Sequence, residues 1–246
     1  MADTDQYNPE MFLGCLPRST RLGDGTFIVG DESVLTIIPR DKLETMSMRP
    51  LIRNRVNQGM QNSCASAATA GCVMLKRHDI GLADVVLSQA SLYRFVNGGR
   101  DSGSQLDDNL RQLAKVGIAP VSVVPQYNWQ ANPPWPTTWV AEAAKYKALE
   151  WWDLADTMAI ASAVSVGMPC VIGVFWSGGG GHAIVCIGIR VKADGSLEFE
   201  ILNSWANWGD GQCGFLPESQ VARGIQTFGA WALRSVTESE PVPSPV

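Results

Sequence analysis

The pattern of small, apolar and polar side chains predicts three helices in this chain. Residues 64–78 are rich in alanine, which favours a helix packed closely against its surroundings, and Gly81 supplies a stop signal. Residues 106–115 place apolar side chains on one helical face, and Gly117 follows where a glycine commonly ends a helix. Residues 156–166 form a third, more apolar helical segment.

Apolar runs of strand length follow in the second half of the chain. Residues 170–176, 183–190 and 197–202 are expected to be strands. Residues 193–196 read Ala-Asp-Gly-Ser, which favours a turn between the last two strands. Alternation of apolar and polar residues is weak in 183–190, so this strand is expected in the centre of a sheet or barrel.

The two ends of the chain and its middle differ from these regular segments. Residues 1–45 form an N-terminal arm in which 26–29 and 34–38 are expected to be short strands. Residues 118–150 combine prolines with tryptophans and indicate a loop-rich crossover, because clustered aromatic side chains favour burial. Residues 235–246 are polar and rich in proline, which predicts a flexible tail.

Composition indicates a globular protein of modest surface charge. The 246 residues suffice for one large domain or two small lobes, with 46% hydrophobic and 17% charged residues. A net charge of -5 argues against nucleic acid as a partner. The longest apolar run, at 164–176, is broken by polar residues, glycine and proline, so no membrane-spanning helix is expected. The first residues lack the pattern of a signal peptide, which predicts an intracellular protein.

The six cysteines are an even number that would allow three disulfides. We expect reduced thiols instead, because no export signal is present and a chain of this size can stabilise its own core. Cys72 lies too far along the helix to bridge to Cys64, while Cys170 and Cys186 fall in apolar runs typical of a core. The chain has no C-x-x-C pair and only two histidines, so neither a metal site nor another cofactor is expected.

Cys64 stands where a polar turn meets the first predicted helix. Asn62 or Ser63 is expected to cap that helix by accepting a hydrogen bond from a free backbone N–H. The positive end of the helix dipole lowers the pKa of a thiol placed there, and the thiolate is the nucleophilic form. Most cysteines in helices of small residues are nevertheless inert and buried, so Cys64 needs support from the rest of the chain.

Four separated patches give that support. In chain order they are Gln58, Cys64, the Gly-Gly-His-Ala-Ile-Val patch around His182, and Asn203-Ser204-Trp205 followed by Trp208-Gly209. Together they resemble the papain-like cysteine peptidases, the family of papain and the cathepsins. The resemblance covers about residues 46–234.

This resemblance implies an α+β fold of two lobes. A helical lobe, about residues 50–120, would hold the nucleophile helix at its centre, with 87–93 in a second helix. An antiparallel, β-barrel-like lobe would span about residues 121–234. Relatives often carry an inhibitory prosegment that runs through the cleft. The arm at 1–45 is therefore either a reduced prosegment or a segment that docks on the domain.

The resemblance also assigns the reacting groups. Cys64 would attack a carbonyl of a peptide or protein substrate, with His182 as the base of a thiolate–imidazolium pair and the acid for the leaving amine. Water would then hydrolyse the thioester. The other histidine, His78, lies roughly 21 Å along the helix from Cys64, so it cannot be this base.

Three further residues would support the reaction. Asn203 would accept a hydrogen bond from the far ring nitrogen of His182 and fix its orientation, and Trp205 would shield that bond from water. The side-chain amide of Gln58 and the backbone N–H of Cys64 would stabilise the oxyanion of the tetrahedral intermediate.

Substrate contacts are expected around the sulfur. The resemblance assigns Ser102, Gly103 and Ser104 to a turn that pairs its backbone with an extended substrate, although the same turn also suits a helix N-cap. Gly181, together with Gly180, would leave the approach to the histidine open.

Two departures from the family pattern keep other functions open. Asn62 stands where a glycine is usual and Ala65 where an aromatic residue is usual, although neither is a reacting group. A papain fold with little or no activity could serve as a structural or docking component of a larger assembly, such as a virus particle. The same thioester chemistry could also serve acyl transfer or amide hydrolysis.

Overall fold

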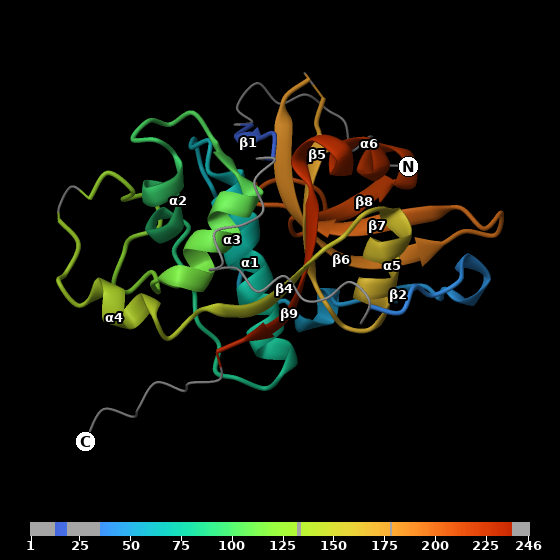
Figure 1. Cartoon of the computed structure of the whole chain (residues 1–246), viewed down its shortest axis with the longest axis horizontal. Coiled ribbons are helices and arrows are strands. Elements are labelled where there is room, and N and C mark those ends of the chain that lie inside the picture. The colour runs from blue at the N-terminus through green and yellow to red at the C-terminus, as the bar shows by residue number, and fades with distance from the viewer. Residues whose placement is uncertain (1–12, 19–34, 132–133, 178, 238–246) are drawn as a thin grey trace.

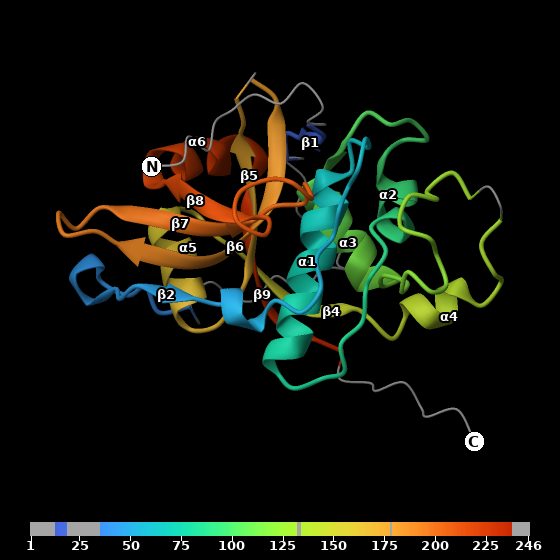
Figure 2. The same ribbon diagram turned by 180° about the vertical axis from the view of Figure 1, so that it is seen from behind.

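The computed structural model describes residues 13–18, 35–131, 134–177 and 179–237, which fold into two lobes (Figure 1). One lobe gathers the helices α1 to α4, and the other contains an antiparallel sheet flanked by α5 and α6. The view from behind shows α1 along the boundary between the lobes (Figure 2). This α+β arrangement in two lobes matches the expectation.

The elements have the following bounds. The helices are α1 (Cys64–Asp79), α2 (Ala90–Val96), α3 (Leu106–Lys115), α4 (Trp139–Ala143), α5 (Thr157–Ser165) and α6 (Glu218–Phe228), with the short 3-10 helices η2 (Arg40–Lys42) and η3 (Arg49–Leu51). The strands are β1 (Cys15–Leu16), β2 (Met46–Ser47), β3 (Ser104–Gln105), β4 (Ala148–Asp153), β5 (Cys170–Phe175), β6 (Gly181–Val191), β7 (Leu197–Leu202), β8 (Cys213–Pro217) and β9 (Ala230–Val236).

Helix α1 confirms the alanine-rich prediction and is buried along most of its length. Its small side chains allow close packing on strand β6, because a Cβ added at Gly71 would lie 3.4 Å from Val185. Ser63 occupies the N-cap position without a capping bond, and its Oγ instead accepts from Gln89 Nε2 at 3.0 Å. The predicted side-chain cap is therefore wrong, and the first backbone N–H groups of α1 stay available to another acceptor.

Helix α3 confirms the amphipathic prediction. Leu106, Leu110 and Leu113 are buried on one face. The chain leaves the helix through Gly117, whose φ of +95° is a conformation that favours glycine. Helix α2 packs beside α3, although α2 begins at Ala90 and not at Leu87.

The sheet has the order β4-β9-β5-β6-β7-β8, with β2 beside β6. Strand β6 lies inside this order, as its weak alternation predicts, and it joins β7 through the expected turn, where Lys192 N–H donates to Ser196 O at 2.9 Å. The order ends on β4 and β8, which do not pair with each other in the described part of the chain. The sheet of the expected antiparallel lobe is therefore open and does not close into a complete barrel.

The N-terminal arm differs from the expectation. Residues 35–38 form no strand, and Ile38 N–H donates instead to Ser162 Oγ of α5 at 2.9 Å. The other predicted strand, at 26–29, and residue 34 lie outside the described residues. The backbone N–H of Ile38 was expected to pair with a neighbouring strand, but the hydroxyl of Ser162 accepts its hydrogen bond instead.

The crossover at 118–150 contains two elements that the sequence analysis did not assign, α4 and the start of β4. The ring of Phe95 in α2 stacks on Trp139 of α4, with centroids 5.4 Å apart. Aromatic packing therefore holds α4 beside the helical lobe, beyond the expected boundary near residue 121 (Figure 1). Strand β4 pairs with β9 in the sheet, and this pairing extends to Val236.

All six cysteines are free and buried. Within the described ranges, no three His, Cys, Asp or Glu side chains gather as a metal site. Over the same ranges, none of the helices has the length and apolar character needed to cross a membrane.

Candidate active site

His182 and Asn203 come together at one end of the sheet. His182 is the second residue of β6, Asn203 directly follows β7, and His182 Nε2 lies 2.8 Å from Asn203 Oδ1. Trp205 stacks on the imidazole with ring centroids 4.0 Å apart, and Trp176 contacts the ring edge-on at 5.1 Å. The asparagine and the two indoles therefore hold the ring in one orientation and shield it from water.

Cys64 reaches this end of the sheet from α1. The backbone N–H groups that act on its sulfur include that of Ala183, which follows His182 on β6, and that of Gly14. The Nδ1 atom of His182 is buried and has no hydrogen-bond partner. The thiol and the ring thus meet at the same end of β6 without a hydrogen bond between them in this structure.

Gln58 is fully buried and is held by a residue that the sequence analysis did not assign. Its Oε1 accepts from Ser204 Oγ at 2.6 Å, and its backbone N–H donates to Ser204 O at 2.9 Å. Its Nε2 donates to Gln61 O at 2.8 Å. The position of Ser204 directly after Asn203 could have suggested this role. Asn203 contacts His182, and the next residue, Ser204, contacts Gln58.

Part of the N-terminal arm, the docked segment (residues 13–18), passes directly over Cys64. Gly14 O accepts from Ser104 N–H at 2.8 Å. A Cβ added at Gly14 would lie 1.9 Å from Asn62 O, and one added at Gly103 would lie 2.3 Å from Gly14 O. Because Gly14 and Gly103 have no side chain, their backbones can come this close. The segment therefore packs tightly against the helical lobe.

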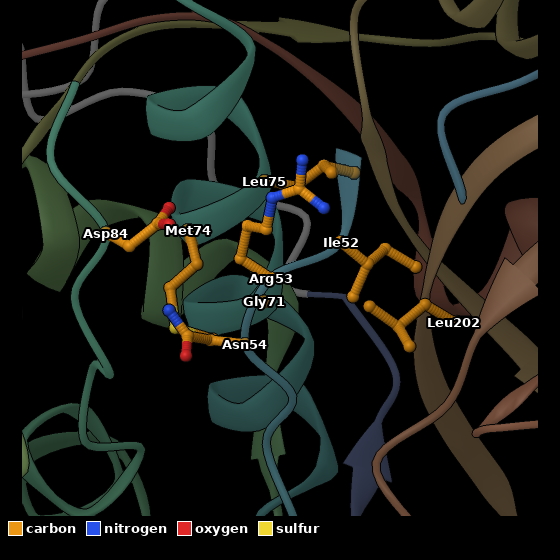
Figure 3. Close-up of a pocket in the computed structure, with 8 residues that line it drawn as sticks. All are labelled: Ile52, Arg53, Asn54, Gly71, Met74, Leu75, Asp84 and Leu202. Atoms are coloured by element: carbon orange, nitrogen blue, oxygen red, sulfur yellow. The ribbon is translucent and has the colours of Figure 1, made fainter. Parts of the chain in front are cut away.

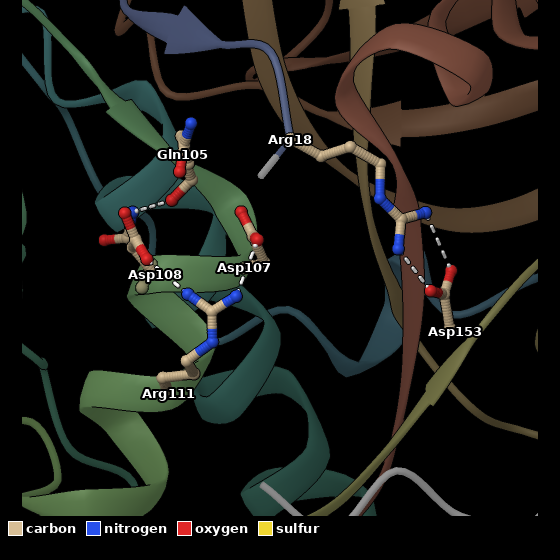
Figure 4. A network of polar contacts seen from close by, with 7 residues as sticks. Arg18, Gln105, Asp107, Asp108, Arg111 and Asp153 are labelled. Carbon is tan, nitrogen blue, oxygen red and sulfur yellow. Dashed lines mark hydrogen bonds and ion pairs between the residues drawn. The ribbon is translucent and has the colours of Figure 1, made fainter. Parts of the chain in front are cut away.

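The other lobe contacts the same segment. A Cβ added at Gly181 would lie 2.1 Å from Cys15 O. Farther along, Arg18 forms two hydrogen bonds with Asp153 at 3.2 and 2.5 Å, and its guanidinium lies 4.9 Å from the ring centre of Trp231 (Figure 4). The docked segment therefore fills the groove between the lobes at the position of Cys64. The sequence Leu13-Gly14-Cys15 does not predict that these residues bind in the groove, because the contacts are formed by backbone atoms and not by side chains.

The residues predicted to bind substrate largely contact this segment. Ser104 and Gly103 hold Gly14, in a parallel pairing of β1 with β3, and Gly181 lies against Cys15. Ser102 is exposed, and its part in substrate binding stays a prediction. The N-cap alternative is not observed, because Gln105 is the N-cap of α3 and makes no side-chain bond.

The turn before α1 is fixed by Asn62, one of the departures from the family pattern. Asn62 N–H donates to Asp101 Oδ1, and its Nδ2 donates to Asp101 O, both at 2.8 Å. Tyr93 Oη donates to the same carboxylate at 2.6 Å. The Asn62 side chain therefore ties the nucleophile turn to the turn before Ser104 and does not cap the helix.

Burial is the main influence on the pKa values of Cys64 and His182 and outweighs any effect of the helix dipole. Burial raises the pKa of the Cys64 thiol from 9.0 to about 11, although backbone N–H groups act in the opposite direction. Burial also lowers the pKa of His182 from 6.5 to about 4, against the effect of its bond to Asn203. Between these values the thiol and the imidazole are both neutral. The expected lowering of the thiol pKa is therefore wrong for the form with the segment docked.

Displacing the docked segment is expected to activate Cys64. Gly14→Ala adds the Cβ that clashes with Asn62 O, so the segment cannot seat. Water then reaches the sulfur, and its pKa falls toward 9.0 or below, which raises the thiolate fraction at pH 7 by about 100-fold. We expect alkylation of Cys64 by iodoacetamide to accelerate by a similar factor, and its midpoint pH to fall from about 11.

Peptide mapping distinguishes this effect from general unfolding. Cys15 becomes reactive together with Cys64, while Cys72 stays protected in the core. Leu16→Ala is the matched control, because the side chain of Leu16 is exposed in the same segment. Equal alkylation rates for Gly14→Ala and the parent chain would show that the segment does not control access.

A pocket elsewhere in the molecule is too small for a substrate. It lies beside the second half of α1, is lined by Gly71, Met74, Ile52 and neighbouring residues, and has a volume of about 10 Å³, room for about one water molecule (Figure 3). The groove over Cys64 is therefore the candidate site.

Comparison with known proteins finds similar structures but no similar sequence. No model of a known protein family matches the sequence, and no curated protein matches it either. Xylellain, a cysteine protease from Xylella fastidiosa, superposes with a TM-score of 0.71 at 21% identity, over 91% of this chain and 97% of its own.

Two further solved structures agree. A procathepsin B from Trypanosoma congolense has a TM-score of 0.65 at 17% identity, covering 92% of this chain and 87% of its own. A stem bromelain precursor has a TM-score of 0.63 at 15% identity, covering 93% and 78%. With the sheet order and the buried helix α1, these likenesses show that the chain has the fold of the papain-like cysteine proteases.

Proposed function

We propose that the protein is a cysteine peptidase that hydrolyses peptide bonds with Cys64 as nucleophile and His182 as base. One observation carries the proposal. Asn203 binds His182 through Nε2, which leaves the buried Nδ1 unpaired beside the strand residue whose N–H acts on the Cys64 sulfur. A base needs this combination of a fixed tautomer and a free nitrogen near the nucleophile.

The reaction follows from these positions. His182 Nδ1 takes the thiol proton, and the sulfur forms a bond to the substrate carbonyl carbon. The C–N bond then breaks, and His182 returns the proton to the leaving amine. Water, deprotonated by the same nitrogen, hydrolyses the thioester and restores the Cys64 thiol.

Gln58 and the backbone N–H of Cys64 would stabilise the negative oxygen formed in both steps. Ser204 supports this role because its hydroxyl donates to Gln58 Oε1. That bond fixes which end of the amide is the oxygen and presents Nε2 on the other side. A preorganised donor needs no reorientation while charge develops on the substrate.

The docked segment makes the form seen here a resting form. Gly14 occupies the place above the sulfur that a substrate carbonyl must take. A peptide therefore competes with residues 13–18 for Ser104 and for the groove. Activity begins when the segment leaves.

The experiment uses the epoxysuccinyl peptide E64 on the full-length chain, both as it is and with Gly14→Ala. We expect one adduct per chain, mapped to Cys64, with loss of protein hydrolysis in proportion to labelling. The core cysteines Cys72, Cys170 and Cys186 stay unmodified because they are buried. A Gly14→Ala chain that neither accepts E64 at Cys64 nor cleaves any peptide would exclude the peptidase function.

The second candidate is a docking component that keeps the fold without the activity. The complete burial of Cys64 beneath residues 13–18 motivates it, together with the raised thiol pKa. Its signature is stoichiometric co-purification with one partner and no labelling of Cys64 in the Gly14→Ala chain. Labelling with hydrolysis of small amides but not of proteins would instead indicate an amidase or acyl transferase.

A further inference from the structure

An asparagine interrupts the apolar face of helix α3. Asn109 is fully buried in the same helix as the buried leucines Leu106, Leu110 and Leu113. Burying an amide side chain is costly unless its polar atoms are hydrogen-bonded. The partners of Asn109 therefore show what a polar residue achieves at this position.

The amide of Asn109 is paired at both ends. Its Nδ2 donates to Ser104 Oγ at 3.0 Å and to Gln105 O at 2.7 Å. Its Oδ1 accepts from Ser66 Oγ at 2.5 Å. The carbonyl of Gln105 can only accept, so this contact fixes which end of the amide is the nitrogen. Ser66 and Ser104 are fully buried as well, so bulk water does not compete for these bonds.

The two serines belong to different parts of the candidate site. Ser66 lies in the first turn of α1, two residues after Cys64, and α3 packs beside α1 (Figure 1). Ser104 lies in β3, and its backbone N–H donates to Gly14 O at 2.8 Å. Asn109 therefore connects the helix that carries the nucleophile to the residue that binds a backbone in the groove.

The peptide unit between Gly103 and Ser104 is also held from its other side. Gly103 N–H donates to Tyr93 Oη at 3.2 Å, and Tyr93 Oη donates to Asp101 Oδ1 at 2.6 Å. The N–H of Gly103 is thus occupied, whereas that of Ser104 is directed at the groove. With Gly103 and the Ser104 hydroxyl both anchored, the direction of the Ser104 N–H is fixed relative to α1.

We propose that Asn109 is a positioning residue that holds the Ser104 N–H in register with Cys64. This inference rests on the proposed peptidase function, in which a substrate backbone takes the place of Gly14 at Ser104. Asn109 touches neither occupant of the groove and acts only through Ser104. Its loss should therefore weaken the binding of both the substrate and the docked segment.

The first test uses the full-length Gly14→Ala chain and a capped dipeptidyl coumarin amide. Asn109→Leu replaces the amide by an apolar side chain branched at the same carbon. We expect KM to rise about tenfold with kcat within about threefold, because a backbone bond at Ser104 forms in the bound substrate and persists in the transition state. Alkylation of Cys64 by iodoacetamide does not use Ser104 and should stay within about twofold. A general loss of structure would change both rates.

The second test needs no hydrolysis. In the parent chain the Ser104 N–H holds the docked segment at Gly14 O. Asn109→Leu should loosen this contact and accelerate alkylation of Cys64 by about fivefold or more. The same substitution thus speeds alkylation in the parent chain and leaves it unchanged in the Gly14→Ala chain.

Helix α1 provides a matched pair of variants. Ser66→Ala removes only the bond to Asn109 Oδ1, and we expect KM to rise about threefold. The double variant should be no worse than Asn109→Leu alone, because the two side chains act as one unit. Thr69→Val removes another fully buried hydroxyl, which donates to Ala65 O at 2.8 Å within the helix, so KM should stay within about twofold. Ser66→Ala tests the connection if Asn109→Leu fails to fold.

The possible outcomes separate the two claims. Hydrolysis with an unchanged KM in Asn109→Leu, or parent-chain alkylation that this substitution does not accelerate, would overturn the role of Asn109 and keep the peptidase function. A Gly14→Ala chain without hydrolysis and without labelling of Cys64 by E64 would overturn the peptidase function. Faster alkylation of the Asn109→Leu parent chain would still support the hold of Asn109 on Ser104.

Discussion

Replacing His182 by alanine is expected to lower kcat/KM for peptide hydrolysis by about 10³-fold or more. Without the imidazole, the reaction loses the group that takes the proton of Cys64 and returns it to the leaving amine. Alkylation of Cys64 by iodoacetamide should slow as well, because this reaction also needs the thiolate. The comparison is made in the Gly14→Ala background, so that access to the sulfur is equal in all variants.

The chain contains its own control for this experiment. His78→Ala removes the other histidine, which lies near the end of α1, is hydrogen-bonded to Asp84 at 2.9 Å and is far from the groove. Its kcat/KM should stay within about twofold of the parent, as for most surface substitutions. Equal losses in the two variants would point to a fold defect, and no loss in His182→Ala would remove the histidine from the mechanism.

Gln58→Ala is expected to cost about 2.7–4 kcal/mol of transition-state stabilisation, a fall of about 10²–10³-fold in kcat. The substitution removes a donor to the oxyanion, which exists only after the carbonyl is attacked. Alkylation by iodoacetamide forms no oxyanion, so its rate at Cys64 should be almost unchanged. This split between hydrolysis and alkylation distinguishes a lost oxyanion donor from a disturbed nucleophile.

Gln61→Ala is the matched variant in the same turn. The Gln61 side chain contacts Tyr127 O, while its backbone carbonyl, which accepts from Gln58, is retained. We therefore expect hydrolysis by Gln61→Ala to stay within a few-fold of the parent. A Gln58→Ala variant that lost alkylation and hydrolysis equally would contradict the assigned role.

The parts of the fold that follow from sequence have strong local signals. The alanine run of α1, the leucine spacing of α3 and the turn at 192–196 each specify their structure within a short stretch. The strands β8 and β9 and helix α6 were not predicted. Strand β8, for example, contains Gly214 and Pro217, and its pairing with β7 defines it more than its own composition does.

The candidate site divides in the same way. The order of Gln58, Cys64, His182 and Asn203 identified the residues that lie around the groove. Docking of the arm at 1–45 was one of the expected alternatives, but the stretch that docks could not be predicted, because Gly14 acts through its backbone and through the absence of a side chain. The pKa directions were also out of reach, since the burial that raises one and lowers the other exists only after the lobes and the segment assemble.

The paired bonds between Gln58 and Ser204 have a mechanical consequence. They clamp the two lobes at the reaction centre, and Gln212 Nε2 adds a third bond to Val56 O at 3.0 Å. Swinging the lobes apart would break the support of the oxyanion donor, so the groove must become accessible by peeling the segment away from a rigid frame. Its width is then set in advance, and a stiff ligand shaped to that width would bind without any cost of domain closure.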